Sequence, residues 1–243
     1  MTSMASIDPA PPTEVNGLID RRVVVVDDHQ LLSESLALAL SVQGYDVRRV
    51  PVPAHSGAPA ALVTAILRVR PRVVLLDLEL GAFGDGNRLI EPLARADVRV
   101  VVMTGSPDRA RWGRAVLAGA RKVVSKARPL SELTSVVRRA NQGLGLMDAA
   151  EREELLGAWH TRLVENDDID RRLAQLSRRE SAVLGQLMAG LSVRDIAARG
   201  VVSEATVRTQ VKAVLTKLGV STQLAAVSVA NRASWHPPTE QAS

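Results

Sequence analysis

The sequence has 243 residues, of which 46% are hydrophobic and 23% charged, as in globular proteins that bury a core. Its apolar runs are shorter than the ~18 residues of a membrane span, and its polar N-terminus is unlike a secretion signal. The absence of cysteine excludes disulfides and thiolate chemistry, and 2% aromatic residues argue against stacking platforms for single-stranded nucleic acid. We therefore expect a cytoplasmic protein with no membrane partner.

Residues 1–21 are polar and rich in proline, and we expect a disordered leader. From 22 to 143, valine-rich runs alternate with amphipathic stretches, which predicts strands buried on both faces alternating with helices. The expected helices cover about 30–43, 57–69, 87–96, 108–119 and 129–142. The expected strands are Val23–Asp27, Tyr45–Val50, Val73–Asp77, Val98–Thr104 and Lys122–Ser125. This alternation indicates an α/β fold with a five-stranded, doubly wound parallel sheet.

Residues 144–171 are expected to form a linker with a helix, because Leu155, Leu156, Trp159 and Leu163 recur at helical spacing. From 172 to 233 the pattern changes to short helices alone, followed by a tail at 234–243. Ser–x–x–acid capping boxes begin the first two of these helices, and a serine can cap the third. The predicted caps are Ser177, Ser192 and Ser203, and the predicted helix ends are Gly190, Gly200 and Gly219.

Charge is placed unevenly along the chain. Residues 171–235 carry ten lysines and arginines against three acids, a net charge of +7, whereas the remainder sums to −2. A compact basic segment attached to a near-neutral body is typical of a module that contacts phosphates, although charge alone is equally compatible with a solvated basic face.

Reactive side chains follow four of the predicted strands. Because ligands bind at the carboxyl ends of parallel strands, we expect these residues to meet at one edge of the sheet: Asp27, Asp28, Asp77, Thr104 and Lys126. Clustered carboxylates favour a Mg²⁺ ion, and a hydroxyl and an ammonium beside them suit a phosphoryl group. The chemistry implied is phosphoryl transfer to a carboxylate, and we expect Asp77 to be the acceptor. Any one of these residues could simply end a strand, but five at the correct ends are harder to dismiss.

These residues also carry a family resemblance. Val-Val-Asp27-Asp28, Leu-Leu-Asp77, Asp85-Gly86, Met-Thr104-Gly105 and Ser125-Lys126 resemble the receiver domain of two-component response regulators, a flavodoxin/CheY-like fold, over residues 22–143. The resemblance implies that a sensor histidine kinase phosphorylates Asp77. It implies that Mg²⁺ is held by Asp28, Asp77, the carbonyl of Glu79 and, through water, Asp27, and that Thr104 and Lys126 bind phosphoryl oxygens.

Three positions depart from the receiver pattern. Val123 stands where an aromatic switch residue is usual, and Gly81 and Ala127 stand where proline is usual. We therefore expect the phosphorylation chemistry to be intact, but transmission of the signal to lack the usual aromatic switch residue. His29 beside the acidic pair is interpreted as a bystander, and Trp112 and Trp159 as packing anchors.

The basic segment resembles the LuxR/NarL-type helix-turn-helix over residues 172–233. The matches include Leu176-Ser-Arg-Arg-Glu180, Gly190-Leu-Ser192, Asp195-Ile-Ala197, Thr206-Val-Arg208 and Lys217-Leu-Gly-Val220, with Gln210 and Gly200 as departures. In the third helix, Arg208, Thr209 and Lys212 share the face opposite an apolar stripe, so we expect them to read bases in the major groove. The expected phosphate contacts are Arg194, Ser203, Thr206 and Lys217. The alternative is a merely solvated helix face.

The combined interpretation is a DNA-binding transcription regulator of the NarL/LuxR (FixJ) family, not an enzyme, that works as a homodimer when phosphorylated. In the wider family the C-terminal helix pairs the DNA-binding domains, and the resemblance implies the same role for the helix around Leu224 and Val227. One rival is a regulator whose receiver is a phosphorylation-independent or ligand-gated dimerisation module. A second is a Mg²⁺-dependent aspartyl phosphohydrolase using Asp77-Leu-Glu79. An exposed Phe83 would indicate a contact with a kinase or a second subunit.

Overall fold

The computed structural model describes residues 21–55 and 57–237. The chain divides into two compact units, residues 1–160 and 161–243. Apart from Arg21, the expected disordered leader lies outside the described residues, as do the last six residues of the expected tail. In the described ranges, no single helix has the length and apolarity to cross a membrane, although one bent helix pair, residues 204–218 with 223–232, passes that test jointly.

The first unit is built on the five-stranded parallel sheet that the sequence predicts. Its strands lie in the order β2-β1-β3-β4-β5, and every neighbouring pair is parallel. The strands are β1 (Arg22–Val26), β2 (Asp46–Arg49), β3 (Val73–Asp77), β4 (Arg99–Thr104) and β5 (Lys122–Ser125). The three central strands are almost wholly buried, which explains their continuous β-branched and leucine composition.

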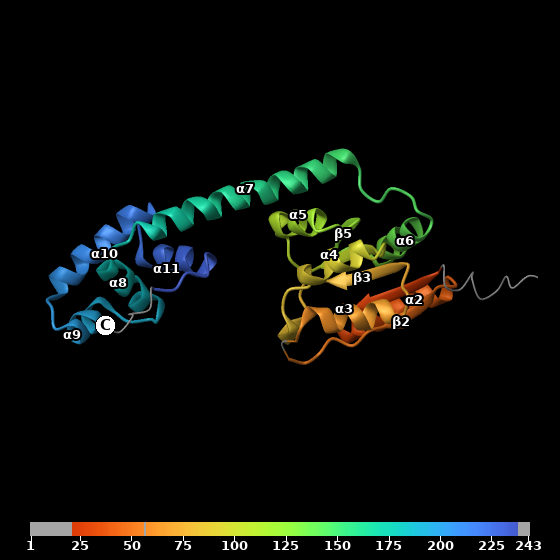
Figure 1. Cartoon of the computed structure of the whole chain (residues 1–243), viewed down its shortest axis with the longest axis horizontal. Coiled ribbons are helices and arrows are strands. Elements are labelled where there is room, and N and C mark those ends of the chain that lie inside the picture. Colours follow the sequence, from red (N-terminus) through yellow and green to blue (C-terminus); the bar gives the residue numbers. More distant parts are fainter. Residues whose placement is uncertain (1–20, 56, 238–243) are drawn as a thin grey trace, which may run out of the picture. The chain divides into compact units, whose positions relative to one another are not determined.

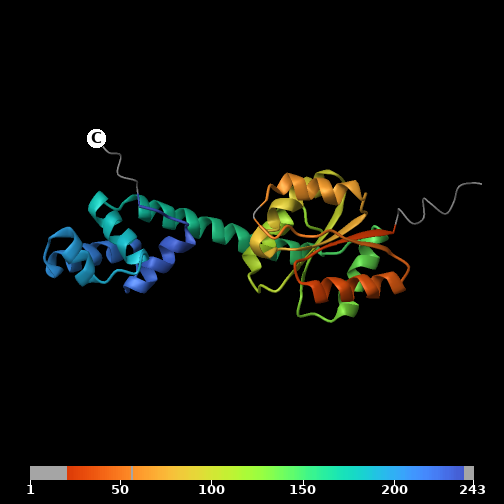
Figure 2. The same cartoon turned by 90° about the horizontal axis from the view of Figure 1, so that it is seen from below.

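Helices cover both faces of the sheet (Figure 2). On one face, α2 (Gln30–Val42) and α6 (Leu130–Asn141) contribute Leu36, Leu40, Leu133 and Val137 to one hydrophobic core. The other face packs against α3 (Pro59–Arg68), α4 (Asn87–Arg95) and α5 (Arg109–Leu117), through Ile66, Leu89, Ile90, Ala115 and Val116 among others. A short 3₁₀ helix, η1 (Gly81–Phe83), follows β3. The doubly wound α/β fold is therefore confirmed.

Strand register brings the chemistry-bearing residues to one edge. Val26 of β1 pairs with Leu76 of β3, and Asp77 pairs with Met103 of β4. Thr104 pairs in turn with Ser125 of β5. The residues that follow these positions therefore emerge together at the carboxyl edge of the sheet.

Helix α7 (Ala149–Ala174) is 26 residues long and extends beyond the linker range that the sequence predicts. Its first part puts Leu155 fully into the core of the first unit, on the α3–α5 face of the sheet. Ile169 and Leu173 belong to a core of the second unit. One helix thus contributes to the cores of both units.

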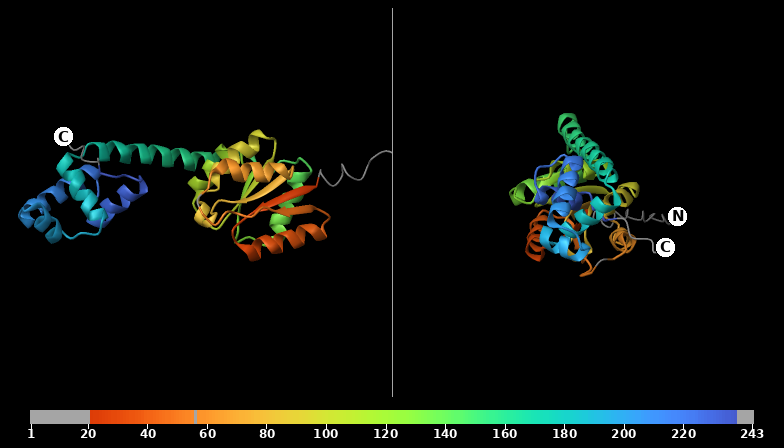
Figure 3. Two further views of the ribbon diagram at one scale, coloured as in Figure 1. Left: turned by 60° about the horizontal axis from the view of Figure 1, so that its bottom comes forward. Right: turned by 90° about the vertical axis from the view of Figure 1, so that its left-hand side faces the viewer.

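The second unit contains α8 (Arg178–Met188), α9 (Val193–Gly200), α10 (Glu204–Leu218) and α11 (Gln223–Arg232). Three of them, α8, α10 and α11, share a core with the last turns of α7, whereas α9 packs against α8 and α10 (Figure 3). Ser177 and Ser192 form complete capping boxes with Glu180 and Asp195, as predicted, and Ser203 caps α10 by accepting the N–H of Thr206. These side chains fix where the three short helices begin.

The ends of these helices agree with the prediction in two cases out of three. Gly190 and Gly219 adopt the left-handed conformation, with φ of 81° and 68°. Gly200 does not: it is the last helical residue of α9, and Val201 after it takes the left-handed position, with φ of 51°. A β-branched residue is strained there, and Val201 is 91% exposed, so packing does not explain the choice.

Candidate functional site

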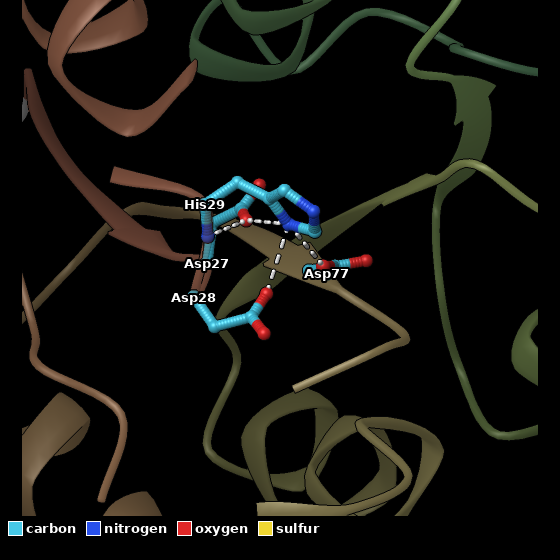
Figure 4. A group of neighbouring side chains, drawn as sticks. All are labelled: Asp27, Asp28, His29 and Asp77. Atoms are coloured by element: carbon cyan, nitrogen blue, oxygen red, sulfur yellow. Dashed lines mark hydrogen bonds and ion pairs between the residues drawn. The ribbon is translucent and has the colours of Figure 1, made fainter. Parts of the chain in front are cut away.

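Three aspartates and a histidine converge at the carboxyl edge of the sheet (Figure 4). Asp27, Asp28 and His29 follow β1, and Asp77 ends β3; one ligand atom from each lies within 4.8 Å of the others. The side chains of Asp27 and Asp77 are fully buried, whereas that of Asp28 is 31% exposed. The three aspartates predicted at the strand ends therefore lie together.

Lys126 joins this cluster from the loop after β5. Its Nζ lies 2.7 Å from Oδ2 of Asp77 and 2.9 Å from Oδ2 of Asp27. Its backbone N–H donates to the carbonyl of Thr104 at 2.8 Å, which ties the ends of β4 and β5 together. Thr104 itself is buried, and its Oγ1 accepts the N–H of Ser106 at 3.1 Å.

Burial and charge act in opposite directions on the Asp77–Lys126 pair. Burial raises the pKa of Asp77 above its ordinary value of 3.8, although hydrogen bonds from Lys126 and from the Glu79 N–H oppose this. Burial also opposes the charged form of Lys126, but hydrogen bonds to Asp77 and Asp27 outweigh it and raise the pKa of that ammonium. The raised pKa of Lys126 favours its charged form, whereas the raised pKa of Asp77 disfavours its charged form.

The donor set fits a magnesium ion. It offers carboxylate oxygens from three aspartates, the hard ligands that Mg²⁺ prefers. Oδ2 of Asp27 is buried and accepts no hydrogen bond, although the Lys126 ammonium lies nearby. A cation bound here, or its bound water, would compete with the Lys126 ammonium for this oxygen.

His29 is part of the cluster rather than a bystander. Its Nδ1 lies 2.9 Å from Oδ1 of Asp28 and 3.3 Å from both Oδ1 of Asp27 and Nζ of Lys126. Its backbone N–H donates to Oδ1 of Asp27 at 2.8 Å, and its ring, 65% exposed, lies beside the carboxylates (Figure 4). The available sequence signal was its position directly after two acids at a strand end.

The loop after Asp77 explains one departure from the receiver pattern. Gly81 has φ of 52°, which proline cannot adopt, and a Cβ there would lie 2.7 Å from Oδ2 of Asp28. Glu79, whose carbonyl is an expected metal ligand, directs its side chain to Arg111 at 3.0 Å. Phe83 is only 5% exposed, so it offers no contact of the kind that exposure would have indicated.

A second departure from the receiver pattern, the alanine after Lys126, also has a structural explanation. Ala127 donates its backbone N–H to Oγ of Ser125 at 3.2 Å, a bond that proline could not make. Val123 in β5 is 3% exposed and packs in the core.

In the second unit, α10 presents the expected polar face. Val207, Val211 and Val214 are buried, while Arg208 and Lys212 project from the opposite side. The Arg208 side chain is 71% exposed and is held by Glu204 at 3.0 Å, one turn earlier. The other expected contacts on this part of the unit are also exposed: Arg194, Ser203, Thr206 and Thr209.

Lys217 differs from the other expected phosphate contacts. Its Nζ donates to Oε2 of Glu180 at 2.7 Å and to the carbonyl of Gln175 at 3.1 Å. The side chain therefore ties α10 to the start of α8, and the ion pair lowers the pKa of Glu180. This makes Lys217 the weakest candidate of the set for phosphate binding.

The first unit has an acidic pocket, suited to a phosphoryl group, on a doubly wound sheet, and the second has an exposed basic helix in a helix-turn-helix. Together they define a DNA-binding regulator that carries a receiver domain. Residues 23–138 match the family model of the response regulator receiver domain, and residues 174–230 match that of the bacterial regulatory proteins of the luxR family. The chain belongs to the NarL/LuxR family of two-component response regulators, which are DNA-binding transcription regulators.

The relatives agree with this placement along most of the chain. A probable transcriptional regulatory protein NarL of Mycobacterium tuberculosis is 30% identical over 87% of this chain and 94% of its own. The DNA-binding transcriptional activator DevR/DosR of the same organism is 29% identical over 82% and 88%. Among solved structures, the response regulator ChrA of a heme-sensing two-component system is 27% identical over 87% and 96%, with a TM-score of 0.42.

Proposed function

We propose that this regulator is switched by phosphorylation of Asp77, with a sensor histidine kinase as the phosphoryl donor. The observation that carries the proposal is the buried Asp77 carboxylate, 2.7 Å from the Lys126 ammonium and beside two further aspartates at the carboxyl edge of the sheet. The family to which the chain belongs supplies the reaction class. Bound Mg²⁺, held by Asp27, Asp28, Asp77 and the carbonyl of Glu79, would neutralise charge on the phosphoryl oxygens.

In the proposed step an oxygen of Asp77 attacks the phosphorus of a phosphohistidine. The new P–O bond forms as the P–N bond breaks, and the imidazole nitrogen leaves with the electron pair. The Lys126 ammonium, already aimed at Oδ2 of Asp77, is placed to pair with the charge that arrives on the phosphoryl group. Thr104, at the next strand end, would donate its hydroxyl to a phosphoryl oxygen.

The second unit would bind double-stranded DNA through α10. We assign base contacts to Arg208, Thr209 and Lys212, whose side chains extend from the helix face opposite its buried valines. Phosphate contacts would come from Arg194, Ser203 and Thr206, with Lys217 joining only if it exchanges Glu180 for a phosphate.

We further propose that the phosphorylated form acts as a homodimer in the cytoplasm, where DNA and a kinase are both available. Leu224 on α11 is 80% exposed and is the residue we assign to pairing of the DNA-binding units. Val227 is partly buried against the core of its own unit and would add its remaining exposed surface to the pairing. Two paired units would combine two modest half-site affinities into one strong one.

The test is incubation with Mg²⁺ and a small phosphodonor, followed by mass spectrometry of the intact chain and its peptides. We expect the mass gain of one phosphoryl group, located on Asp77, lost in Asp77→Asn and dependent on divalent metal. Asp108→Asn is the matched control, because Asp108 caps α5 outside the cluster. No gain, or a gain on another residue, would overturn the proposal.

A further inference from the structure

Helix α7 packs against α5 at a glycine that leaves no room for a side chain. A Cβ added to Gly113 would overlap the backbone carbonyl of Leu155 and lie 2.9 Å from Cβ of Trp159. Gly113 is buried, and Leu155 is fully buried in the core of the first unit. The two helix backbones therefore approach closely at this point, with the first turns of α7 alongside α5 (Figure 1).

Polar contacts fix α7 in this position. The Nζ of Lys122 at the start of β5 lies 2.6 Å from Oε2 of Glu151, and Arg109 lies 2.8 Å from Glu154. Arg114 of α5 stands over the ring of Trp159, 5.9 Å from its centroid. These contacts, with the buried Leu155, make the first turns of α7 a docked part of the receiver unit.

Helix α5 also contacts the phosphoryl-binding loops. Nε1 of Trp112, the neighbour of Gly113, donates to the carbonyl of Ser106 at 2.9 Å. The N–H of Ser106 donates to Oγ1 of Thr104 at 3.1 Å, so two hydrogen bonds connect the Thr104 hydroxyl to the Trp112 ring.

A second, more exposed connection runs through arginines. Arg111 lies 3.0 Å from Glu79, and Arg114 lies 3.3 Å from Asp85 in the loop after Asp77. Exposed ion pairs of this kind contribute little to stability on their own. Arg114, however, also stands over the ring of Trp159 in α7. The contacts of α5 thus reach the phosphorylation site on one side and α7 on the other.

We propose that α5 is the output element of this receiver: Trp112 senses the Thr104 loop, and the close packing at Gly113 transfers the change to α7. This inference rests on the proposed phosphorylation of Asp77. It supplies a route for transmission in a chain where Val123 occupies the position of the usual aromatic switch.

Phosphorylation would act on α5 through these hydrogen-bond connections. When a phosphoryl group draws the Thr104 side chain toward itself, Oγ1 moves, so the hydrogen bond from the Ser106 N–H must follow it or break, and Trp112, bonded to the Ser106 carbonyl, is displaced in turn. Tightly packed interfaces do not deform continuously, so a displaced α5 must move α7 or release it. Because α7 also supplies Ile169 and Leu173 to the core of the DNA-binding unit, that unit senses the change.

The decisive variant is Trp112→Phe, which keeps an aromatic ring and removes the Nε1–H donor. We expect Asp77 phosphorylation equal to that of the native chain, but loss of the phosphodonor-induced change in hydrogen exchange within residues 149–160. The phosphorylation-induced gain in DNA affinity, about fivefold or more for coupled sites, should also be lost. A full gain in both measurements in Trp112→Phe would overturn the proposal.

Gly113→Ala tests the other half of the relay, with Gly157→Ala as its matched control. Gly157 lies in α7 close to Leu155, but it faces open space, with nothing within 4 Å of an added Cβ. We expect Gly113→Ala to exchange faster in residues 149–160 before any phosphodonor is added, and Gly157→Ala, which gains helix propensity at an exposed position, to exchange no faster than the native chain. Equal protection in all three proteins would contradict docking at Gly113.

Failure of the relay is distinguishable from failure of the phosphorylation proposal. If the native chain gains no phosphoryl group on Asp77, the proposed function is wrong. If it does gain one and Trp112→Phe responds to it like the native chain, the relay alone is wrong.

Discussion

Replacing Lys126 with methionine removes the ammonium that lies 2.7 Å from Asp77 and 2.9 Å from Asp27. At an effective dielectric constant of about 20, each contact corresponds to an attraction of about 6 kcal/mol, most of which offsets desolvation of the three groups. Both carboxylates are fully buried, so the substitution leaves two acids without their cation. We expect the free energy of unfolding to fall by about 3–5 kcal/mol in metal-free buffer.

The assay is urea unfolding of Lys126→Met and the native chain, each with EDTA and with Mg²⁺. The variant should regain much of its loss in Mg²⁺, because carboxylates freed from the ammonium bind the cation more strongly. Lys122→Met is the control: its ion pair with Glu151 is partly exposed, and the loss should be about 1 kcal/mol and insensitive to Mg²⁺. Lys126→Met as stable as the native chain in EDTA would refute the reasoning.

Three further predictions concern stability and DNA binding. Burial raises the pKa of Asp77, so the charge of this carboxylate destabilises the fold increasingly as pH rises from 3.8 through the raised value. In EDTA, Asp77→Asn should therefore be more stable than the native chain at neutral pH and equally stable below about pH 3.8. Arg208→Ala or Lys212→Ala should weaken binding at the preferred DNA site by about 1–3 kcal/mol and relax base preference, as measured by competitive titration. Val201→Gly should raise the free energy of unfolding by about 0.5–1 kcal/mol in urea, since it relieves a left-handed valine and removes an exposed side chain.

Each of these predictions has an opposing result. A stability difference for Asp77→Asn that is constant from pH 4 to 7 would show that burial of its charge is not the cause. Equal weakening of Arg208→Ala on all DNA sequences would make that residue a phosphate contact. Destabilisation by Val201→Gly would show that the left-handed turn is favoured by contacts of the valine side chain.

The sheet and its active edge could be predicted because both depend on local patterns. Runs of valine and leucine ending at Asp77 or Thr104 predict strands buried on both faces, and parallel pairing forces their carboxyl ends to one edge. Serine-to-acid spacings at Ser177 and Ser192 predicted helix starts for the same reason: the bonds involved span three residues.

Features that depend on tertiary contacts could not be predicted in this way. The position of His29 beside the carboxylates depends on a backbone bond to Asp27, and the role of Lys217 depends on Glu180, 37 residues away. Gly113 looks like an ordinary helix residue until α7 is placed against it. The end of α9 differs from the prediction because Val201, and not Gly200, adopts the left-handed conformation.

The most direct test is the affinity of the full chain for a DNA site selected by the protein from a random pool, with and without Mg²⁺ and phosphodonor. We predict that phosphodonor raises the affinity about fivefold or more in the native chain and leaves that of Asp77→Asn unchanged. The same affinity in both states of a native chain that carries the phosphoryl group on Asp77 would contradict it.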